Sequence, residues 1–242
     1  MLKMLRFVSI FFVILLTFVT TAKPYRIFIP QKSSLVVEYS NGKSKVLHQN
    51  CAEAKRHPAS LTKIMTIYLL LEAIENKKIS INTKFKVSKF ASNQMPSKLG
   101  LIPGETISAL DCIKALLVKS ANDVAVVVAE GVSGSVSAFC SKMNSKAKAL
   151  GMSSTHFENP SGVPNIKQIT SASDIVILGL SLYKKFQKYW PLFSLKNFTY
   201  KGKQYGTHCK ILRWYKGSDG AKTGFTCASG YNLWVTAEKK NL

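Results

Sequence analysis

Ser60 and Lys63 form the first pair of residues in this sequence whose types and spacing could do chemistry. They lie at the start of a predicted helix over residues 61–76, and residues three apart share one helix face. Residues 61–74 are apolar on nearly every side, which indicates a helix in the protein interior. Burial lowers the pKa of a lysine, and a neutral amine can accept the proton of a serine nucleophile. The structural alternative is a capping serine followed by a snorkelling lysine.

Two later motifs bring further polar groups in a recognisable order. Ser120-x-Asn122 lies between two predicted helices, and Lys222-Thr223-Gly224 opens a predicted strand. Taken singly, Ser120 and Asn122 are also typical helix caps, and the second motif is also typical of a strand edge with a turn glycine. The order Ser-x-x-Lys, Ser-x-Asn, Lys-Thr-Gly is the signature set of penicillin-binding proteins and class A β-lactamases.

Strands at both ends of the chain and helices between them must position these motifs. An Asn-Gly turn predicts a hairpin over residues 33–48, and a second hairpin is predicted over residues 221–238. Further helices are predicted over residues 109–118, 122–130, 136–150 and 172–183. We therefore expect an α+β fold in which the N- and C-terminal strands pair in one antiparallel sheet packed on the central helix, beside a mostly helical lobe.

The first 22 residues are typical of a secretory signal peptide. Lys3 and Arg6 precede an apolar run over residues 7–19, and Thr20-Thr21-Ala22 offers a cleavage site. The alternative is an uncleaved N-terminal anchor. We expect one domain over residues 23–242, exported to the periplasm or to the outer face of the bacterial cytoplasmic membrane.

The formal net charge of +22 indicates anionic partners. Export and the scattered lysines argue against nucleic acid, which leaves a membrane surface or a wall polymer carrying carboxylates. Five cysteines show no Cys-x-x-Cys spacing and no clustered histidines, so neither a zinc site nor a disulfide framework is predicted. These are Cys51, Cys112, Cys140, Cys209 and Cys227.

Beyond the three motifs, residues 33–235 resemble the D-alanyl-D-alanine carboxypeptidases, the low-molecular-mass penicillin-binding serine peptidases. The resemblance rests on residues 58–66, 117–123, 150–152, 155–157, 159–162 and 219–226. It implies a β-lactamase/transpeptidase-like fold, no metal or organic cofactor, peptidoglycan stem peptides as substrates and β-lactams as covalent inhibitors.

The resemblance also implies a catalytic role for each matching residue. Ser60 would attack the carbonyl between two terminal D-alanines, Lys63 would accept its proton, and Ser120 would relay a proton to the leaving amine. The backbone N–H groups of Ser60 and Phe225 would form the oxyanion hole.

Substrate binding would fall to the remaining motif residues. Asn122 would hold Lys63 and the substrate backbone, and Lys222 would set a positive field. Thr223 would bind the terminal carboxylate. Gly224 would let the substrate backbone lie against the strand.

Two departures from the family pattern keep alternatives open. His208 stands near the place of a family arginine, and the family continues beyond Leu242 with a further strand and helix. We therefore weigh a truncated, inactive wall-binding homologue. A β-lactamase is disfavoured by the setting of Glu158. His156 and Asn159 are interpreted as loop scaffolding, Asp219 as a brace for the turn, and the aromatic residues of 186–193 as core.

Overall fold

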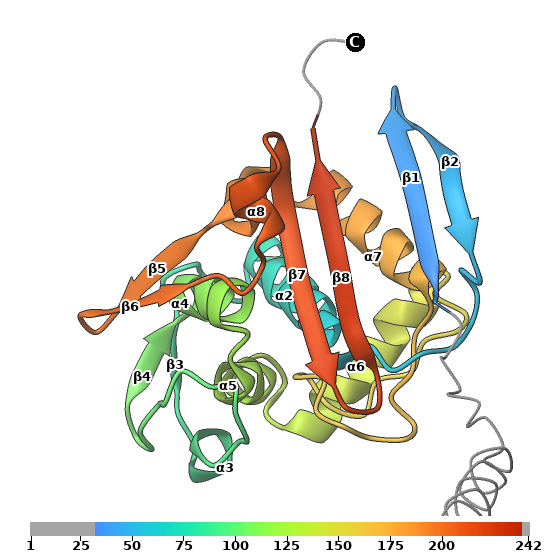
Figure 1. The fold of residues 1–242 in the computed structure, drawn as a ribbon. Helices are drawn as coiled ribbons and strands as arrows, with labels where there is room; N and C mark the ends of the chain where they lie inside the picture. Colours follow the sequence, from blue (N-terminus) through green and yellow to red (C-terminus); the bar gives the residue numbers. More distant parts are fainter. Residues whose placement is uncertain (1–31, 239–242) are drawn as a thin grey trace, which may run out of the picture. The chain divides into compact units, whose positions relative to one another are not determined.

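The computed structural model describes residues 32–238, so the predicted signal segment lies outside the described residues. The strands of Figure 1 are β1 (Ser34–Ser40), β2 (Lys43–Asn50), β3 (Lys84–Lys86), β4 (Thr106–Ser108), β5 (Asn197–Tyr200), β6 (Lys203–Gly206), β7 (Ser218–Thr226) and β8 (Gly230–Ala237). The helices are η1 (Ala59–Leu61), α2 (Thr62–Glu75), α3 (Lys89–Ser92), α4 (Ala109–Lys114), η2 (Ala115–Lys119), α5 (Asn122–Ser133), α6 (Val136–Ala149), α7 (Ala172–Lys185), η3 (Gln187–Ser194) and α8 (Ile211–Trp214).

Both predicted hairpins are confirmed. β1 and β2 are antiparallel around Asn41 and Gly42, whose φ angles of +51° and +77° suit the Asn-Gly turn that the sequence predicts. β7 and β8 are antiparallel, with Lys222 opposite Trp234.

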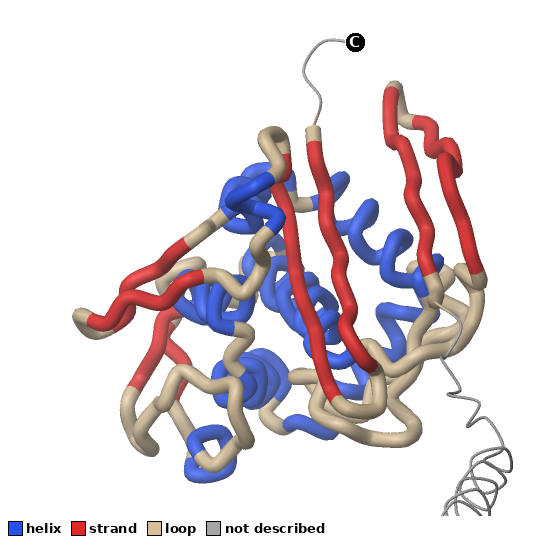
Figure 2. Tube along the Cα trace, in the orientation of Figure 1, coloured by secondary structure: helices blue, strands red, loops and turns tan. Residues whose placement is uncertain are grey.

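The expectation of one continuous sheet was wrong for the described residues, in which the strands form four separate two-stranded sheets. The N- and C-terminal hairpins both lie over α7 (Figures 1 and 2), but no ladder of hydrogen bonds joins β1 to β8. Tyr39 of β1 meets the ring of Tyr183 on α7, and Trp234 of β8 lies against Gly179 of the same helix. Because each hairpin is anchored to α7 by its own aromatic side chain, the helix sets their spacing.

The central helix lies in the interior, as its composition predicts. Every residue of α2 from Thr62 to Leu71 is buried, and α5, α6 and α7 pack around it. The short helix η1 precedes it, and Ala59 there has φ +46°, a left-handed conformation that is uncommon for a residue other than glycine. This turn sets the direction in which Ser60 leaves the backbone.

Two helix ends differ from the predicted boundaries. Beyond α4, whose N-terminus is capped by the Ser108 side chain, the chain continues as a π-helical turn, η2, that ends in left-handed Ser120 (φ +58°). Helix α5 runs past Gly131 to Ser133. A Cβ on Gly131 would lie 2.2 Å from the Phe85 ring, so the glycine serves close packing rather than helix termination.

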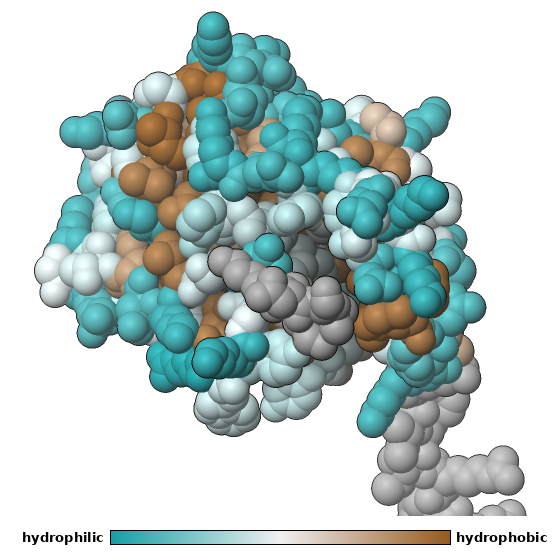
Figure 3. Space-filling view, turned by 90° about the horizontal axis from the view of Figure 1, so that it is seen from above, coloured by the Kyte–Doolittle hydropathy of each residue, from teal (hydrophilic) through white to brown (hydrophobic). Residues whose placement is uncertain are grey.

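The surface mixes apolar and hydrophilic side chains on the end of the molecule that Figure 3 shows. Among residues 32–238, no single helix is long and apolar enough to cross a membrane. The pair α5 and α6 passes the same test together, with a bend of 84° between them.

Candidate active site

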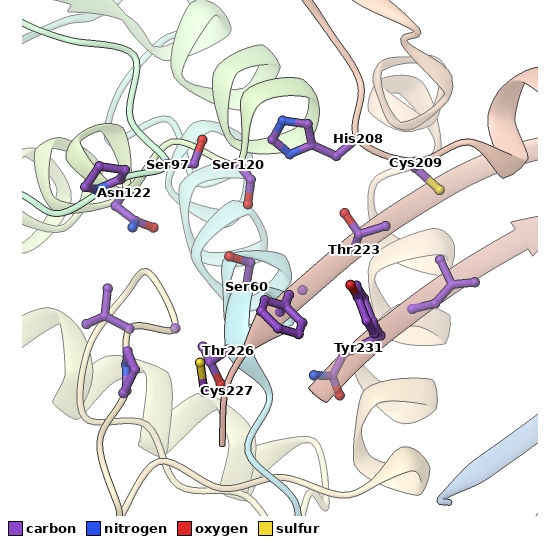
Figure 4. A pocket seen from close by; sticks show the side chains of 18 of the residues that line it. Ser60, Ser97, Ser120, Asn122, His208, Cys209, Thr223, Thr226, Cys227 and Tyr231 are labelled. Atoms are coloured by element: carbon purple, nitrogen blue, oxygen red, sulfur yellow. The ribbon is translucent and has the colours of Figure 1, made fainter. Parts of the chain in front are cut away.

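A cleft of about 740 Å³ brings the three motifs together. Its walls come from η1, the loop around residues 95–97, the start of α5, the loop at residues 162–164 and strand β7. Figure 4 shows Ser60 in the cleft, with Ser120 and Asn122 on one side and Thr223 of β7 on the other. Residues more than 160 positions apart in the sequence therefore line one cavity.

Lys63 lies beneath Ser60 and is completely buried. Its Nζ is 3.1 Å from Ser60 Oγ and donates to Asn122 Oδ1 at 2.7 Å and to the backbone oxygen of Ser161. Burial holds the pKa of Lys63 well below its ordinary value, and nearby Lys222 lowers it further, while Asp123 opposes the shift. As a neutral amine, Lys63 can keep the other two hydrogen bonds and turn its lone pair toward the hydroxyl of Ser60.

A second buried lysine holds Ser120 in place. Lys222 Nζ donates to Ser120 Oγ and to the Thr223 backbone oxygen, both at 2.8 Å. Burial lowers the pKa of Lys222 to about 7, against an opposing contribution from Cys209. Among the described residues, no hydrogen bond joins Lys63 and Ser120. The relay through Ser120 therefore stays a prediction.

Strand β7 passes close to Ser60 because Gly224 has no side chain. A Cβ at Gly224 would lie 2.9 Å from the backbone nitrogen of Ser60 and 3.1 Å from the Cβ of Ala59. The side chain of Phe225 instead packs at 4.6 Å on Tyr231, at the exposed face of the hairpin. The glycine thus allows β7 to lie against η1, as the predicted oxyanion hole of Ser60 and Phe225 requires.

The loop over residues 159–162 lies against Lys63 and binds its amine. Asn159 Oδ1 accepts from the backbone N–H groups of Ser161 (3.2 Å) and Gly162 (2.7 Å), which fixes the turn. Gly162 has φ +85°, and a Cβ there would lie 1.8 Å from the backbone oxygen of Ala59. The sequence interpretation of this loop as scaffolding holds for Asn159, but it missed the Ser161 carbonyl that binds Lys63.

Asp123 is a second residue that the sequence interpretation missed. It is fully buried, and its carboxylate accepts from the backbone N–H groups of Leu99, Gly100 and Leu101 at 2.8–3.2 Å. These bonds order the chain that leads to Met95, whose carbonyl accepts from Asn122 Nδ2 at 2.9 Å. The sequence signal that could have identified Asp123 is an acidic residue within an otherwise largely apolar predicted helix.

His208 and Cys209 also line the cleft, next to Thr223 (Figure 4), and Cys227 lies near its other end. Partial burial lowers the pKa of His208, and the charges of Lys119 and Lys222 lower it further. All five cysteines are free thiols. Within residues 32–238, no group of three or more metal-ligating side chains lies together.

The residues given structural roles behave as expected. Asp219 accepts from Trp190 Nε1 at 3.0 Å and from Thr236 Oγ1 at 2.8 Å, so it braces the start of β7. Trp190 stacks on Phe193 within the buried aromatic cluster. His156 pairs with Glu158 at 2.8 Å, outside the cleft. None of these contacts involves Ser60, Lys63 or Ser120.

A serine hydroxyl next to a lysine of lowered pKa, with a second lysine on the neighbouring strand, is an arrangement suited to acyl transfer through a serine ester. A family model described as D-alanyl-D-alanine carboxypeptidase matches residues 19–242. The chain is 35% identical over 216 residues to the D-alanyl-D-alanine carboxypeptidase DacF of Bacillus subtilis, covering 87% of this chain and 55% of that protein. With DacC of Escherichia coli it shares 32% over 222 residues, covering 88% and 55%.

The chain thus spans about half the length of these curated relatives. Penicillin binding protein 5 from Haemophilus influenzae superposes with a TM-score of 0.82 at 29% identity, covering 87% of this chain and 62% of that one. Penicillin-binding protein D2 from Listeria monocytogenes, in its cefotaxime-bound form, superposes with a TM-score of 0.76 at 30% identity, covering 88% and 86%. By family match, relatives and fold, this chain belongs to the D-alanyl-D-alanine carboxypeptidases, a family of low-molecular-mass penicillin-binding serine peptidases.

Proposed function

We propose that this protein is a serine carboxypeptidase that removes the terminal D-alanine from peptidoglycan stem peptides. The observation that carries the proposal is the contact between Lys63 and Ser60, 3.1 Å long, at a lysine whose charge is suppressed by burial. Such an amine can take the serine proton at neutral pH, which an ordinary surface lysine cannot do.

The reaction begins when Ser60 Oγ attacks the carbonyl between the two D-alanines while its proton passes to Lys63 Nζ. The backbone N–H groups of Ser60 and Phe225 hold the oxyanion of the tetrahedral intermediate. The C–N bond then breaks, and the leaving amine receives a proton from Lys63 by way of Ser120. Water attacks the resulting ester and frees Ser60.

The cationic end of the cleft orients the substrate. Lys222 and the hydroxyl of Thr223 bind the terminal carboxylate, and Asn122 holds the peptide backbone. A β-lactam presents a carbonyl and a carboxylate in a similar arrangement, so it acylates Ser60 and leaves slowly. The substrate is a wall polymer, so we propose that the protein acts outside the cytoplasmic membrane, in keeping with its leader-like first 22 residues.

Labelling with fluorescent penicillin tests the proposal, and intact-protein mass spectrometry counts the adducts per chain. We expect one penicillin per chain, a loss of labelling in Ser60→Ala, and full labelling in the control Ser145→Ala on the exposed face of α6. The wild type should also release D-alanine from a diacyl-Lys-D-Ala-D-Ala peptide. A folded wild type that neither labels nor releases D-alanine would identify an inactive homologue. Rapid turnover of a chromogenic cephalosporin would identify a β-lactamase.

A further inference from the structure

A long stretch of the chain carries cations and no acid, and the proposed catalysis does not account for it. Residues 175–218 contain nine lysines and arginines and no aspartate or glutamate. None of the nine belongs to the three motifs. An unbroken run of one charge sign within 44 residues points to an anionic partner if the charges remain unpaired at the surface.

The structure divides these cations into two groups. Lys185, Lys188 and Lys201 each pair with a glutamate from an earlier part of the chain. The other six have no acidic partner among residues 32–238. Three of these six, Lys210, Arg213 and Lys216, lie in or next to α8.

Two exposed aromatic side chains stand among the unpaired cations. Trp214 is 77% exposed and Tyr215 is 59% exposed, although large aromatic rings are usually buried. Lys210 Nζ lies 5.6 Å from the centre of the Trp214 ring. We call Lys210, Arg213, Trp214, Tyr215 and Lys216 the α8 surface. It lies beside β7, at the upper end of the molecule in Figure 1.

We propose that the α8 surface docks on an anionic lipid bilayer. Tryptophan and tyrosine favour the layer between headgroups and acyl chains, because the ring is apolar and its N–H or O–H remains hydrated. Lysine and arginine next to them are attracted by anionic headgroups. A soluble polyanion would use the cations alone, whereas this surface adds two rings suited to insertion. Lys210 and Ile211 also line the cleft, so docking brings its mouth near the bilayer.

Tryptophan fluorescence can test this at the surface itself. The chain has three tryptophans, of which Trp190 and Trp234 are buried and Trp214 faces water. A blue shift on adding vesicles therefore reports on Trp214. We expect the shift, and quenching by brominated lipid, with vesicles of phosphatidylcholine and phosphatidylglycerol but not with phosphatidylcholine alone. An N-terminal apolar segment that held the chain on a vesicle would by itself leave Trp214 in water.

Matched variants distinguish binding through the α8 surface from a general effect of the protein's net charge. Replacing Lys210, Arg213 and Lys216 together by glutamine should weaken binding to the anionic vesicles at least tenfold. The control replaces Lys77, Lys78 and Lys148 by glutamine, two exposed cations in the turn after α2 and one on α6, and removes the same charge. It should bind within about twofold of the wild type, since charge remote from the bilayer is screened by salt.

Three results would overturn the proposal. One is the absence of any Trp214 shift on anionic vesicles. Another is an equal loss of binding in the control triple variant, which would show that net charge alone acts. The third is an equal shift with polyglutamate, a soluble polyanion, which would reassign the surface to polyanion binding. Penicillin labelling of the same samples reports separately on the proposed catalytic function.

Discussion

Raising the pH above neutrality should weaken the reaction through Lys222. Burial lowers the pKa of this lysine to about 7, so its charge is lost in the range where an ordinary lysine is fully protonated. With that pKa, roughly half of the lysines are charged at pH 7 and about 1% at pH 9. If the cation binds the carboxylate of the ligand, the second-order rate constant for acylation should fall roughly 50-fold over these two pH units.

The charge of Lys63 should affect the acylation rate in the opposite direction. It must be neutral to accept a proton, and its pKa is also lowered, so acylation should rise with pH on the acid side. The expected profile is a bell whose alkaline limb belongs to Lys222. Because the two lysines interact, the two apparent pKa values describe the pair. A bound carboxylate favours the charged form of Lys222 and so raises the pKa of this lysine in the complex. The alkaline limb should therefore lie at higher pH in the profile of kcat than in the profile of kcat/KM.

Stopped-flow acylation by fluorescent penicillin between pH 5.5 and 9.5 measures the profile. The variant Lys222→Arg stays charged throughout this range, so the alkaline limb of its pH profile should vanish. The surface control Lys142→Gln should retain the alkaline limb. A peptide whose terminal carboxylate is amidated gives a second test that needs no variant, because it offers the cation no partner. A rate that stays flat from pH 7 to 9 in the wild type, or an unchanged limb with the amidated peptide, would refute the role of the charge.

Three further predictions concern stability and the support of the site. Lys222 has a folded pKa of about 7 against 10.5 unfolded, so the unfolded chain binds more protons between these values. The free energy of unfolding should therefore rise by about 1.4 kcal/mol per pH unit there, relative to Lys222→Met, in urea titrations. Gly162→Ala would place a Cβ 1.8 Å from the Ala59 carbonyl in a left-handed conformation, and should cost about 3 kcal/mol and slow penicillin labelling. An unchanged urea midpoint would contradict this. Asp123→Ala leaves four backbone donors without their acceptor, those of Leu99, Gly100, Leu101 and Val124. It should lower stability by roughly 3 kcal/mol in the same assay, more than the isosteric Asp123→Asn.

Local features of the chain could be predicted well because their causes lie within a few residues. The Asn41-Gly42 turn adopts the positive φ angles that a two-residue hairpin needs. Ser108 and Ser171 cap their helices, because their side-chain oxygens accept hydrogen bonds from the backbone N–H groups of Asp111 and Asp174. The grouping of the three motifs could be predicted as well, although only through resemblance to a family and not from any local rule.

The sequence alone therefore determined the local elements, the candidate nucleophile and base, and the family. The tertiary structure decided what surrounds them. The lowered pKa of Lys63 arises from complete burial and from Lys222, a residue 159 positions away. The spacing of the two hairpins depends on how each packs on α7, and the Ser161 carbonyl reaches Lys63 only when its loop folds beneath α2. Desolvation and long-range contacts arise only when distant segments exclude water together, so no local pattern encodes them.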